Sequence, residues 1–388
     1  MPWNITDKED SRRRFVDAVL ARCGSFAALC RAHGISRQCG YKWWRRFQRD
    51  GRRGLQERTR GPGRYRRLRA RWWARLAAWR RRHPTWGPLK LRTQLCLQGT
   101  RPPSARTLGR WLASAGLVRR CPRRARPGPL VPAPSPWPAR RATDVWTIDF
   151  KGRFRTGDGA RCEPLTVRDQ ASRFVLVVRA VRQPSERTVR RVLTGLFRRR
   201  GLPLTIRADN GSPFGGGGAL GLSRLSVWWL RLGLRVEFSR PACPQDNGAH
   251  EQMHRVLKAE TARPPAANAR AQQRRFARWC RIYNHHRPHA ALAQQTPASR
   301  YRPSPRPWRA RRPAWRYPAG WTVLQLAANG RAWWAGRQRF IGRAFAGERL
   351  GLRPRAHGIV EVYLGPYLIG TLHPGDLAGL RPARRHHR

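Results

Sequence analysis

Three acidic residues in the middle of the chain have the types and placement for metal-dependent chemistry. Asp149 lies in a short hydrophobic segment, Asp209 directly follows another, and Glu251 lies in a segment with helical periodicity. In an open sheet, ligands gather beyond the carboxyl ends of the strands. Two aspartates and one glutamate form an all-oxygen donor set, which suits Mg²⁺ or Mn²⁺ better than zinc. A pair of such ions can stabilise both the attacking and the leaving oxygen at a phosphodiester, with Asp149 bridging them.

The charge distribution also singles out this middle segment. The 388 residues include 82 Lys and Arg against 20 Asp and Glu, a formal net charge of +62. There is no acid from Arg58 to Thr143, whereas eleven lie between Asp144 and Glu260. Part of the arginine excess is the amino-acid bias of a GC-rich coding sequence. The rest indicates a polyanionic partner, and DNA or RNA is favoured over a membrane surface.

Other function classes are disfavoured by composition. The eight cysteines include no Cys-x-x-Cys pair, so neither a zinc ribbon nor a disulfide framework is predicted. The first residues lack a signal-peptide core, and no run of 18 apolar residues could span a membrane. We therefore expect a protein of the cytoplasm with no membrane partner.

The segment from Pro244 to Lys258 is predicted to turn from a loop into a helix. Asp246 and Asn247 are good N-cap residues. Four residues then form one apolar stripe, at Ala249, Met253, Val256 and Leu257. Glu251 and Lys258 project away from that stripe, two turns apart.

The same helix matches the H-E-x-x-H pattern of zinc proteases, with His250 and His254. A third zinc ligand is missing. One class of zinc protease has Gly and His at the positions where this chain has Leu257 and Glu260. No acid occurs between Glu260 and Glu348 to serve the other class. We therefore expect the two histidines to flank the DNA-facing side of the helix instead.

The elements around the three acids predict a mixed α/β domain with a central sheet. Ser185 is expected to cap a long helix that Gly201 ends. Strands are expected at residues 145–150, 162–167, 174–180, 204–208 and 234–239, and a further helix at 223–232.

Residues 12–49 predict three short helices with a Gly-containing turn before the third, the helix-turn-helix pattern. Arg37, Gln38 and Lys42 would face the major groove of DNA. The alternative is an ordinary three-helix bundle with Trp43 or Trp44 in its core.

A second unit of the same order follows a linker at residues 49–65. Its helices are expected at 72–79, 89–97 and 105–115, with Arg106 and Arg110 on the last. Residues 119–141 are rich in Pro and Arg, which indicates an extended basic linker. Beyond residue 315, short strand-like segments at 321–326, 331–336, 339–341, 358–364 and 367–372 predict a small β-barrel.

Four motifs occur in order along the chain. They are Trp146-Thr147-Ile148-Asp149-Phe150, Ala208-Asp209-Asn210-Gly211 with Phe214, Pro244-Gln245-Asp246-Asn247-Gly248 with Glu251 and Lys258, and Tyr283-Asn284 with Arg287-Pro288-His289. Together they resemble the motifs of insertion-sequence transposases of the DDE, retroviral-integrase-like family.

This resemblance implies a domain order. It comprises a helix-turn-helix domain at 1–60, a second, winged one at 66–120 and a linker at 121–143. An integrase catalytic core of ribonuclease-H-like fold at 144–302 and a small β-barrel with a basic tail at 315–388 complete it. The resemblance also implies DNA strand cleavage and strand transfer at transposon ends by a homo-oligomer.

The family's catalytic and metal-binding triad falls on Asp149, Asp209 and Glu251. The resemblance implies that these residues bind two Mg²⁺ ions, for which Mn²⁺ can substitute. Lys258 falls on its basic position at the DNA end, and Arg255 and Asn247 are expected to contact DNA beside it. The competing hypothesis is a catalytically silent, sequence-specific DNA-binding protein derived from such an enzyme. A ribonuclease H acting on hybrids is disfavoured by the two additional DNA-binding units.

Overall fold

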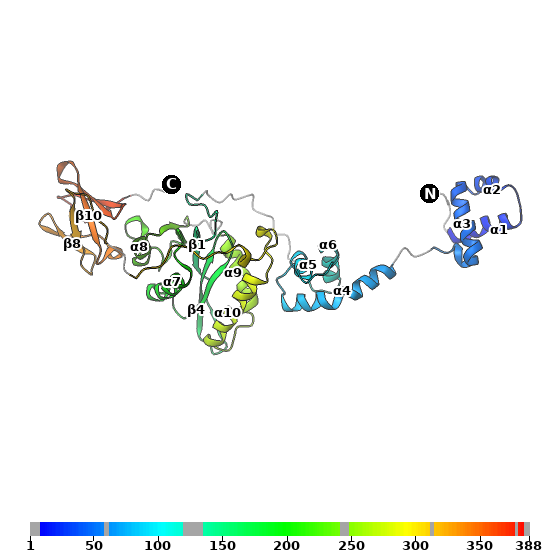
Figure 1. The fold of residues 1–388 in the computed structure, drawn as a ribbon, viewed down its shortest axis with the longest axis horizontal. Coiled ribbons are helices and arrows are strands. Elements are labelled where there is room, and N and C mark those ends of the chain that lie inside the picture. Colours follow the sequence, from blue (N-terminus) through cyan, green and yellow to red (C-terminus); the bar gives the residue numbers. More distant parts are fainter. Residues whose placement is uncertain are drawn as a thin grey trace. The chain divides into compact units, whose positions relative to one another are not determined.

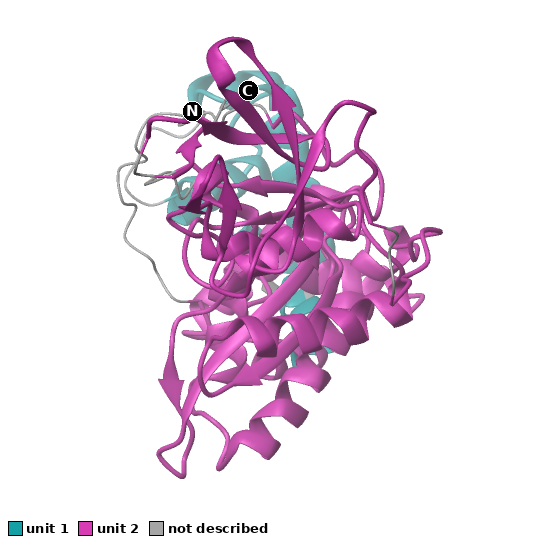
Figure 2. Ribbon diagram, turned by 90° about the vertical axis from the view of Figure 1, so that its left-hand side faces the viewer, with its two compact units in different colours: residues 1–74 teal, residues 75–388 magenta. Residues whose placement is uncertain are grey.

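The computed structural model describes residues 8–57, 62–118, 135–240, 248–310, 314–376 and 379–383. The chain divides into two compact units, residues 1–74 and 75–388, coloured separately in Figure 2. Within the described residues, no helix is long and apolar enough to cross a membrane.

The N-terminal unit has the predicted three-helix arrangement of α1 (Lys8–Leu20), α2 (Phe26–Ala32) and α3 (Arg37–Asp50). The side chains of Ser25 and Ser36 cap α2 and α3. A Cβ atom on Gly40 would lie 2.6 Å from Cys30 Sγ, so glycine is what lets α3 approach α2 this closely. Trp43 is buried in the core that the three helices share.

The region predicted as a linker at residues 49–65 is partly helical. A short 3₁₀ helix, η1 (Gly51–Leu55), follows α3, and α4 (Pro62–Arg82) begins ten residues before the predicted helix. Helices α5 (Pro88–Leu97) and α6 (Ala105–Ser114) follow, the latter capped by Ser104. No strand lies among the described residues 62–118, so the wing stays a prediction.

The central domain contains a mixed sheet. It is built from β1 (Val145–Phe150), β2 (Phe154–Arg155), β3 (Arg161–Asp169), β4 (Val175–Val181), β5 (Thr205–Ala208) and β6 (Arg235–Phe238). Strand β3 pairs antiparallel with β1 and β4, whereas β5 pairs parallel with both β1 and β6. Parallel β1 and β5 therefore end at the same edge of the sheet, as the site prediction required.

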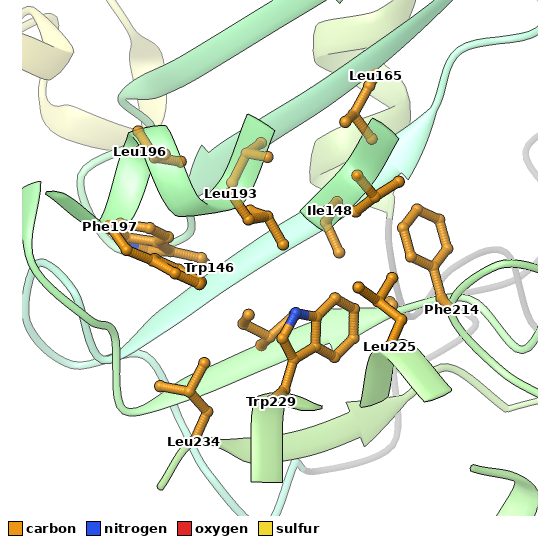
Figure 3. Close-up of a cluster of buried hydrophobic side chains, with 14 of the residues drawn as sticks. Trp146, Ile148, Leu165, Leu193, Leu196, Phe197, Phe214, Leu225, Trp229 and Leu234 are labelled. Atoms are coloured by element: carbon orange, nitrogen blue, oxygen red, sulfur yellow. The ribbon is translucent and has the colours of Figure 1, made fainter. Parts of the chain in front are cut away.

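Helices cover both faces of this sheet (Figure 1). Helices α7 (Glu186–Arg200) and α8 (Arg224–Arg231) pack on one face, over a core that includes Trp146, Ile148 and Trp229 (Figure 3). Helices α9 (Gly248–Thr261) and α10 (Ala269–His285) pack on the other. Because side chains alternate along a strand, Thr147 and Asp149 of β1 point away from the first core and toward α9.

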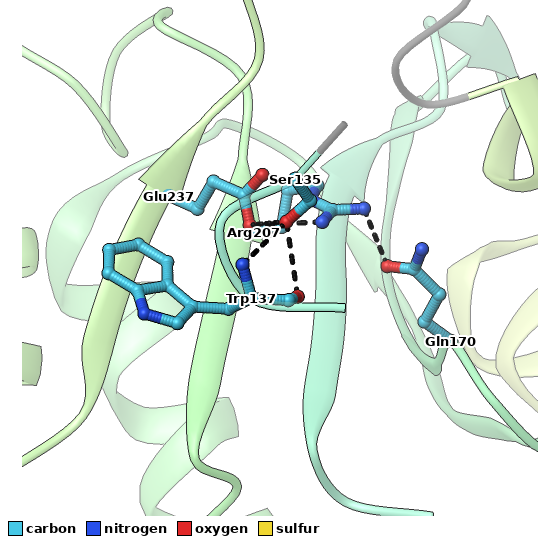
Figure 4. Close-up of polar contacts among 5 residues, drawn as sticks. All are labelled: Ser135, Trp137, Gln170, Arg207 and Glu237. Carbon is cyan, nitrogen blue, oxygen red and sulfur yellow. Dashed lines mark hydrogen bonds and ion pairs between the residues drawn. The ribbon is translucent and has the colours of Figure 1, made fainter. Parts of the chain in front are cut away.

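A buried polar network fixes the approach of the chain to β1 (Figure 4). Arg207 of β5 lies opposite Glu237 of β6, with its Nη2 atom 2.9 Å from Glu237 Oε2. Arg207 also donates to Gln170 over 2.7 Å, and the Ser135 hydroxyl donates to Glu237 over 3.0 Å. The segment before β1 is thereby attached to two parallel strands of the sheet.

The C-terminal end of α9 is also held by a buried acid. Glu260 accepts hydrogen bonds from the hydroxyl of Thr85 and, over 2.7 Å, from Trp279 Nε1 of α10. Arg287 lies 3.5 Å away and forms an ion pair with it. These contacts connect α9 both to α10 and to the turn between α4 and α5.

The C-terminal domain is built from strands, as predicted. One sheet of five strands contains β7 (Thr322–Gln325), β10 (Arg349–Pro354), β11 (Val360–Leu364), β12 (Tyr367–Leu372) and β13 (Arg381–Pro382). Strands β8 (Arg331–Trp334) and β9 (Arg337–Phe340) form a separate hairpin. The pairing of the described strands does not close a barrel, so the barrel stays a prediction.

Strand β10 was missed by the sequence prediction, although it pairs with both β7 and β11. Its centre is Leu350-Gly351-Leu352, and glycine weakens the strand pattern. A Cβ atom on Gly351 would lie 2.3 Å from the ring of Tyr317. The glycine is therefore explained by a packing contact with a distant aromatic ring.

Candidate active site

Asp149 lies near the end of β1, on the face of the sheet that α9 covers. Its side chain is 20% exposed. Burial, together with the negative charges of Asp209 and Glu251, raises the pKa of this carboxyl to about 7. The backbone N–H of Phe150 and the charge of Lys151 act in the opposite direction. Asp149 is thus a desolvated acid within electrostatic range of the two other predicted site acids.

Asp209 and Glu251 reach this region from two other elements. Asp209 immediately follows β5, and its Oδ1 atom accepts a hydrogen bond from the Gly211 N–H over 3.1 Å. Its side chain is exposed, yet the surrounding protein still raises the pKa of its carboxyl. Glu251 lies in the first turn of α9 and is exposed.

The carboxylate oxygens of these three acids are ligands that divalent cations such as Mg²⁺ prefer. The pKa of Asp149 is raised first by burial and then by the repulsion of the Asp209 and Glu251 carboxylates. A divalent cation would offset that repulsion and favour the charged form of each acid. Asp149, Asp209 and Glu251 are the residues that would hold it.

The two histidines that flank Glu251 are buried, so the expectation that they line the DNA-facing side of α9 is wrong. His250 is 0% and His254 is 2% exposed. Burial lowers the pKa of His254 to about 3 and that of His250 well below its ordinary value, so both imidazoles are neutral. Both contact the sheet directly beneath Asp149.

Two threonines of the sheet hold these imidazoles. Thr166, which lies opposite Asp149 in the pairing of β1 with β3, places its hydroxyl 2.7 Å from Nε2 of His250 and 2.7 Å from Nε2 of His254. Nδ1 of His250 lies 2.7 Å from the Thr147 hydroxyl. Nδ1 of His254 lies 3.7 Å from Oδ2 of Asp149.

The periodicity of the sequence could have revealed this arrangement. The buried residues of α9 are His250, Met253, His254, Leu257 and Thr261. These positions follow the spacing i, i+3, i+4, i+7 and i+11 of one helical face. The predicted stripe used Ala249 and Val256 in place of the two histidines, because an apolar residue is the usual occupant of a buried position.

The predicted DNA-contacting residues that the structure describes are all exposed. Arg37, Gln38 and Lys42 are exposed on α3, and Arg106 and Arg110 on α6. On α9, Arg255 and Lys258 are exposed. Asn247 lies outside the described residues. Exposure agrees with contact to a partner, and the assignment of these residues to DNA stays a prediction.

Three regions of the chain match known families. Residues 139–244 and 232–297 match two families described as integrase core domains. Residues 11–64 match a helix-turn-helix domain, and residues 322–375 match the C-terminal domain of IS481 family transposases. The chain thus contains an integrase core domain together with the C-terminal domain of IS481 family transposases. The first helix-turn-helix domain and the ribonuclease-H-like core are thereby confirmed, and the second helix-turn-helix domain stays a prediction.

Solved structures similar to this chain include retroviral integrases. The catalytic core domain of HTLV-2 integrase in complex with magnesium is 13% identical, with 42% of this chain and 99% of that chain covered at a TM-score of 0.33. The core domain of BIV integrase is 19% identical, with 41% and 93% covered at 0.32. A simian T-cell lymphotropic virus intasome in complex with a PP2A regulatory subunit is 16% identical, with 72% and 97% covered at 0.36.

Proposed function

We propose that this chain binds the terminal inverted repeats of a mobile element and catalyses divalent-metal-dependent cleavage and strand transfer of DNA. The observation that carries the proposal is the electrostatic action of Asp209, which follows β5, and of Glu251 on α9 upon Asp149 of β1. Their charges act together on the half-buried Asp149 carboxyl. The same three positions form the triad that the sequence motifs predict.

In this proposal Asp149, Asp209 and Glu251 hold two Mg²⁺ ions, or Mn²⁺ in their place. When bound, such ions supply Lewis-acid stabilisation of the attacking and leaving oxygens of the phosphodiester. The protein contributes the positions of its carboxylates, which are fixed by strand pairing and by the packing of α9. Arg255 and Lys258, exposed on the same helix as Glu251, supply positive charge for the phosphates of the DNA end.

Recognition of the ends is assigned to the two helical units. Arg37, Gln38 and Lys42 of α3 reach base edges in the major groove, and Arg106 and Arg110 of α6 contact a second segment of DNA. Because the two ends of the mobile element must be brought together, the active form is a homo-oligomer on DNA. The substrate is chromosomal, which puts the reaction in the bacterial cytoplasm, at the nucleoid.

The test is an in-vitro joining assay. The substrates are duplex oligonucleotides that carry the inverted repeats flanking the reading frame, incubated with the full chain, Mg²⁺ and a plasmid target. We expect joined products with the wild type and none with Asp149→Asn, which should still bind the ends. Asp158→Asn is the matched control, since Asp158 is an acid of the exposed β2–β3 turn, and it should join normally.

Joining that persists in Asp149→Asn removes the proposed site. The second candidate function, a catalytically silent DNA-binding protein, is favoured by the exposed basic residues of α3, which need no catalysis. It predicts end binding by the wild type with no joined product in either Mg²⁺ or Mn²⁺.

A further inference from the structure

The buried histidines beneath Asp149 have a role beyond the three-acid site. Asp149, His250 and His254 each offer one ligand atom, and these atoms lie within 4.8 Å of one another. Three such groups could in principle form one metal site. Their hydrogen bonds decide which of them has an atom available for an ion.

The Thr166 hydroxyl determines the proton positions. It lies 3.0 Å from the backbone oxygen of Asp149, which can only accept, and 2.7 Å from Nε2 of each histidine. A hydroxyl has one proton to donate and two lone pairs. All three contacts are hydrogen bonds at once only if the hydroxyl donates to the carbonyl and accepts from both imidazoles. In that arrangement both Nε2 atoms carry the proton. The Thr147 hydroxyl also lies 3.3 Å from the Arg168 carbonyl, and if it donates there it accepts from Nδ1 of His250, whose bare Nε2 then accepts from Thr166. In either arrangement His254 donates through Nε2 to Thr166, and its Nδ1 is bare.

The two Nδ1 atoms have different surroundings. Nδ1 of His250 lies 2.7 Å from the Thr147 hydroxyl and is engaged in a hydrogen bond with it in either arrangement. Nδ1 of His254 faces Oδ2 of Asp149 at 3.7 Å, which is longer than a hydrogen bond. Two lone pairs that face each other repel unless a proton or a cation lies between them. The separation suits two ligands of one ion with bonds of about 2.0–2.2 Å.

We propose that Nδ1 of His254 is a metal ligand beside Asp149, which makes this a mixed nitrogen and oxygen site that binds Mn²⁺ in preference to Mg²⁺. The inference rests on the proposed function, because it concerns an ion held by Asp149. Imidazole nitrogen is a ligand of first-row transition-metal ions, of which Mn²⁺ binds most weakly, whereas Mg²⁺ selects oxygen ligands and retains its water. His250 has no comparable role, and it fixes Thr166 and Thr147 beneath the site.

The primary test is pulsed electron paramagnetic resonance of Mn²⁺ bound to the full chain. We expect electron spin-echo modulation from a directly coordinated ¹⁴N nucleus, replaced by the ¹⁵N pattern when the protein is grown with [¹⁵N]histidine. This labelling needs no substitution, so it does not depend on how any variant folds. A bound Mn²⁺ spectrum without histidine nitrogen coupling overturns the proposal.

Two variants then identify the histidine. His254→Gln keeps an amide N–H for Thr166 but removes the imidazole, and it should abolish the coupling and lower Mn²⁺ affinity about tenfold or more. Mg²⁺ affinity should change less, which a purely structural role would not produce. His250→Gln is the matched control and should retain the coupling. Coupling that survives in His254→Gln contradicts the assignment.

The outcome separates this inference from the proposed function. A wild-type chain that binds no Mn²⁺ or Mg²⁺ refutes the metal site as a whole. A chain that binds Mn²⁺ through oxygen alone leaves the three-acid site standing and removes only His254 from it.

Discussion

The raised pKa of Asp149 predicts that metal binding expels a proton. Burial and two neighbouring acids raise the pKa of this carboxyl to about 7, so in the metal-free protein it is about three-quarters protonated at pH 6.5. A metal ligand must be deprotonated, so binding releases that fraction of a proton from Asp149. At pH 8 the release falls to about one-tenth. The raised pKa of Asp209 adds to the release in the same direction.

The raised pKa of Asp149 also makes the stability of the folded protein depend on pH. A carboxyl whose pKa is higher in the folded than in the unfolded protein favours folding while it is protonated. Without metal, this favourable difference is present below pH 4 and is lost as the pH rises from about 4 to about 7. The loss is at most roughly 4 kcal/mol. Asp149→Asn should therefore stabilise the metal-free protein at pH 8 and leave it nearly unchanged at pH 4.

Isothermal titration calorimetry with Mg²⁺ or Mn²⁺ measures the proton release. The apparent binding enthalpy is compared in two buffers of different ionisation enthalpy, at pH 6.5 and at pH 8. The difference between buffers should be large at pH 6.5 and small at pH 8. Asp158→Asn should behave as the wild type, because the pKa of Asp158 is lowered by the Thr156 hydroxyl and the Ala160 N–H. Equal release at both pH values would refute the pKa assigned to Asp149.

Three further predictions concern the scaffold and the DNA contact. Glu237→Ala leaves Arg207 buried without its partner carboxylate, so the free energy of unfolding from chemical denaturation should fall by about 3–5 kcal/mol. An unchanged denaturation midpoint would contradict a stabilising ion pair. Gly40→Val places a Cβ atom 2.6 Å from Cys30 Sγ, so thermal melting should show the N-terminal unit destabilised by about 1–3 kcal/mol. Retention of the wild-type melting temperature would show that the two helices can separate freely. Lys42→Ala should weaken end binding and reduce the salt dependence by about one phosphate contact, and a variant with the wild-type salt slope would place Lys42 away from DNA.

The residue pattern alone was sufficient for the main elements of the core. A short hydrophobic segment identified β1, Ser185 and Gly201 marked the ends of α7, and the ordered acidic motifs singled out three residues. These features are local, because each depends on side chains within a few positions of one another. Strand β10 was missed for the same reason, since Gly351 is explained only by the distant ring of Tyr317.

What the tertiary structure decided is the environment of the site. The sequence indicated that Asp149, His250 and His254 are present, but only the packing of α9 on β1 and β3 buries the histidines and aligns them with Thr166. Burial and proton placement depend on atoms roughly 80 to 100 positions apart in the chain. Desolvation and hydrogen-bond geometry are properties of the assembled fold, and a one-dimensional pattern does not contain them.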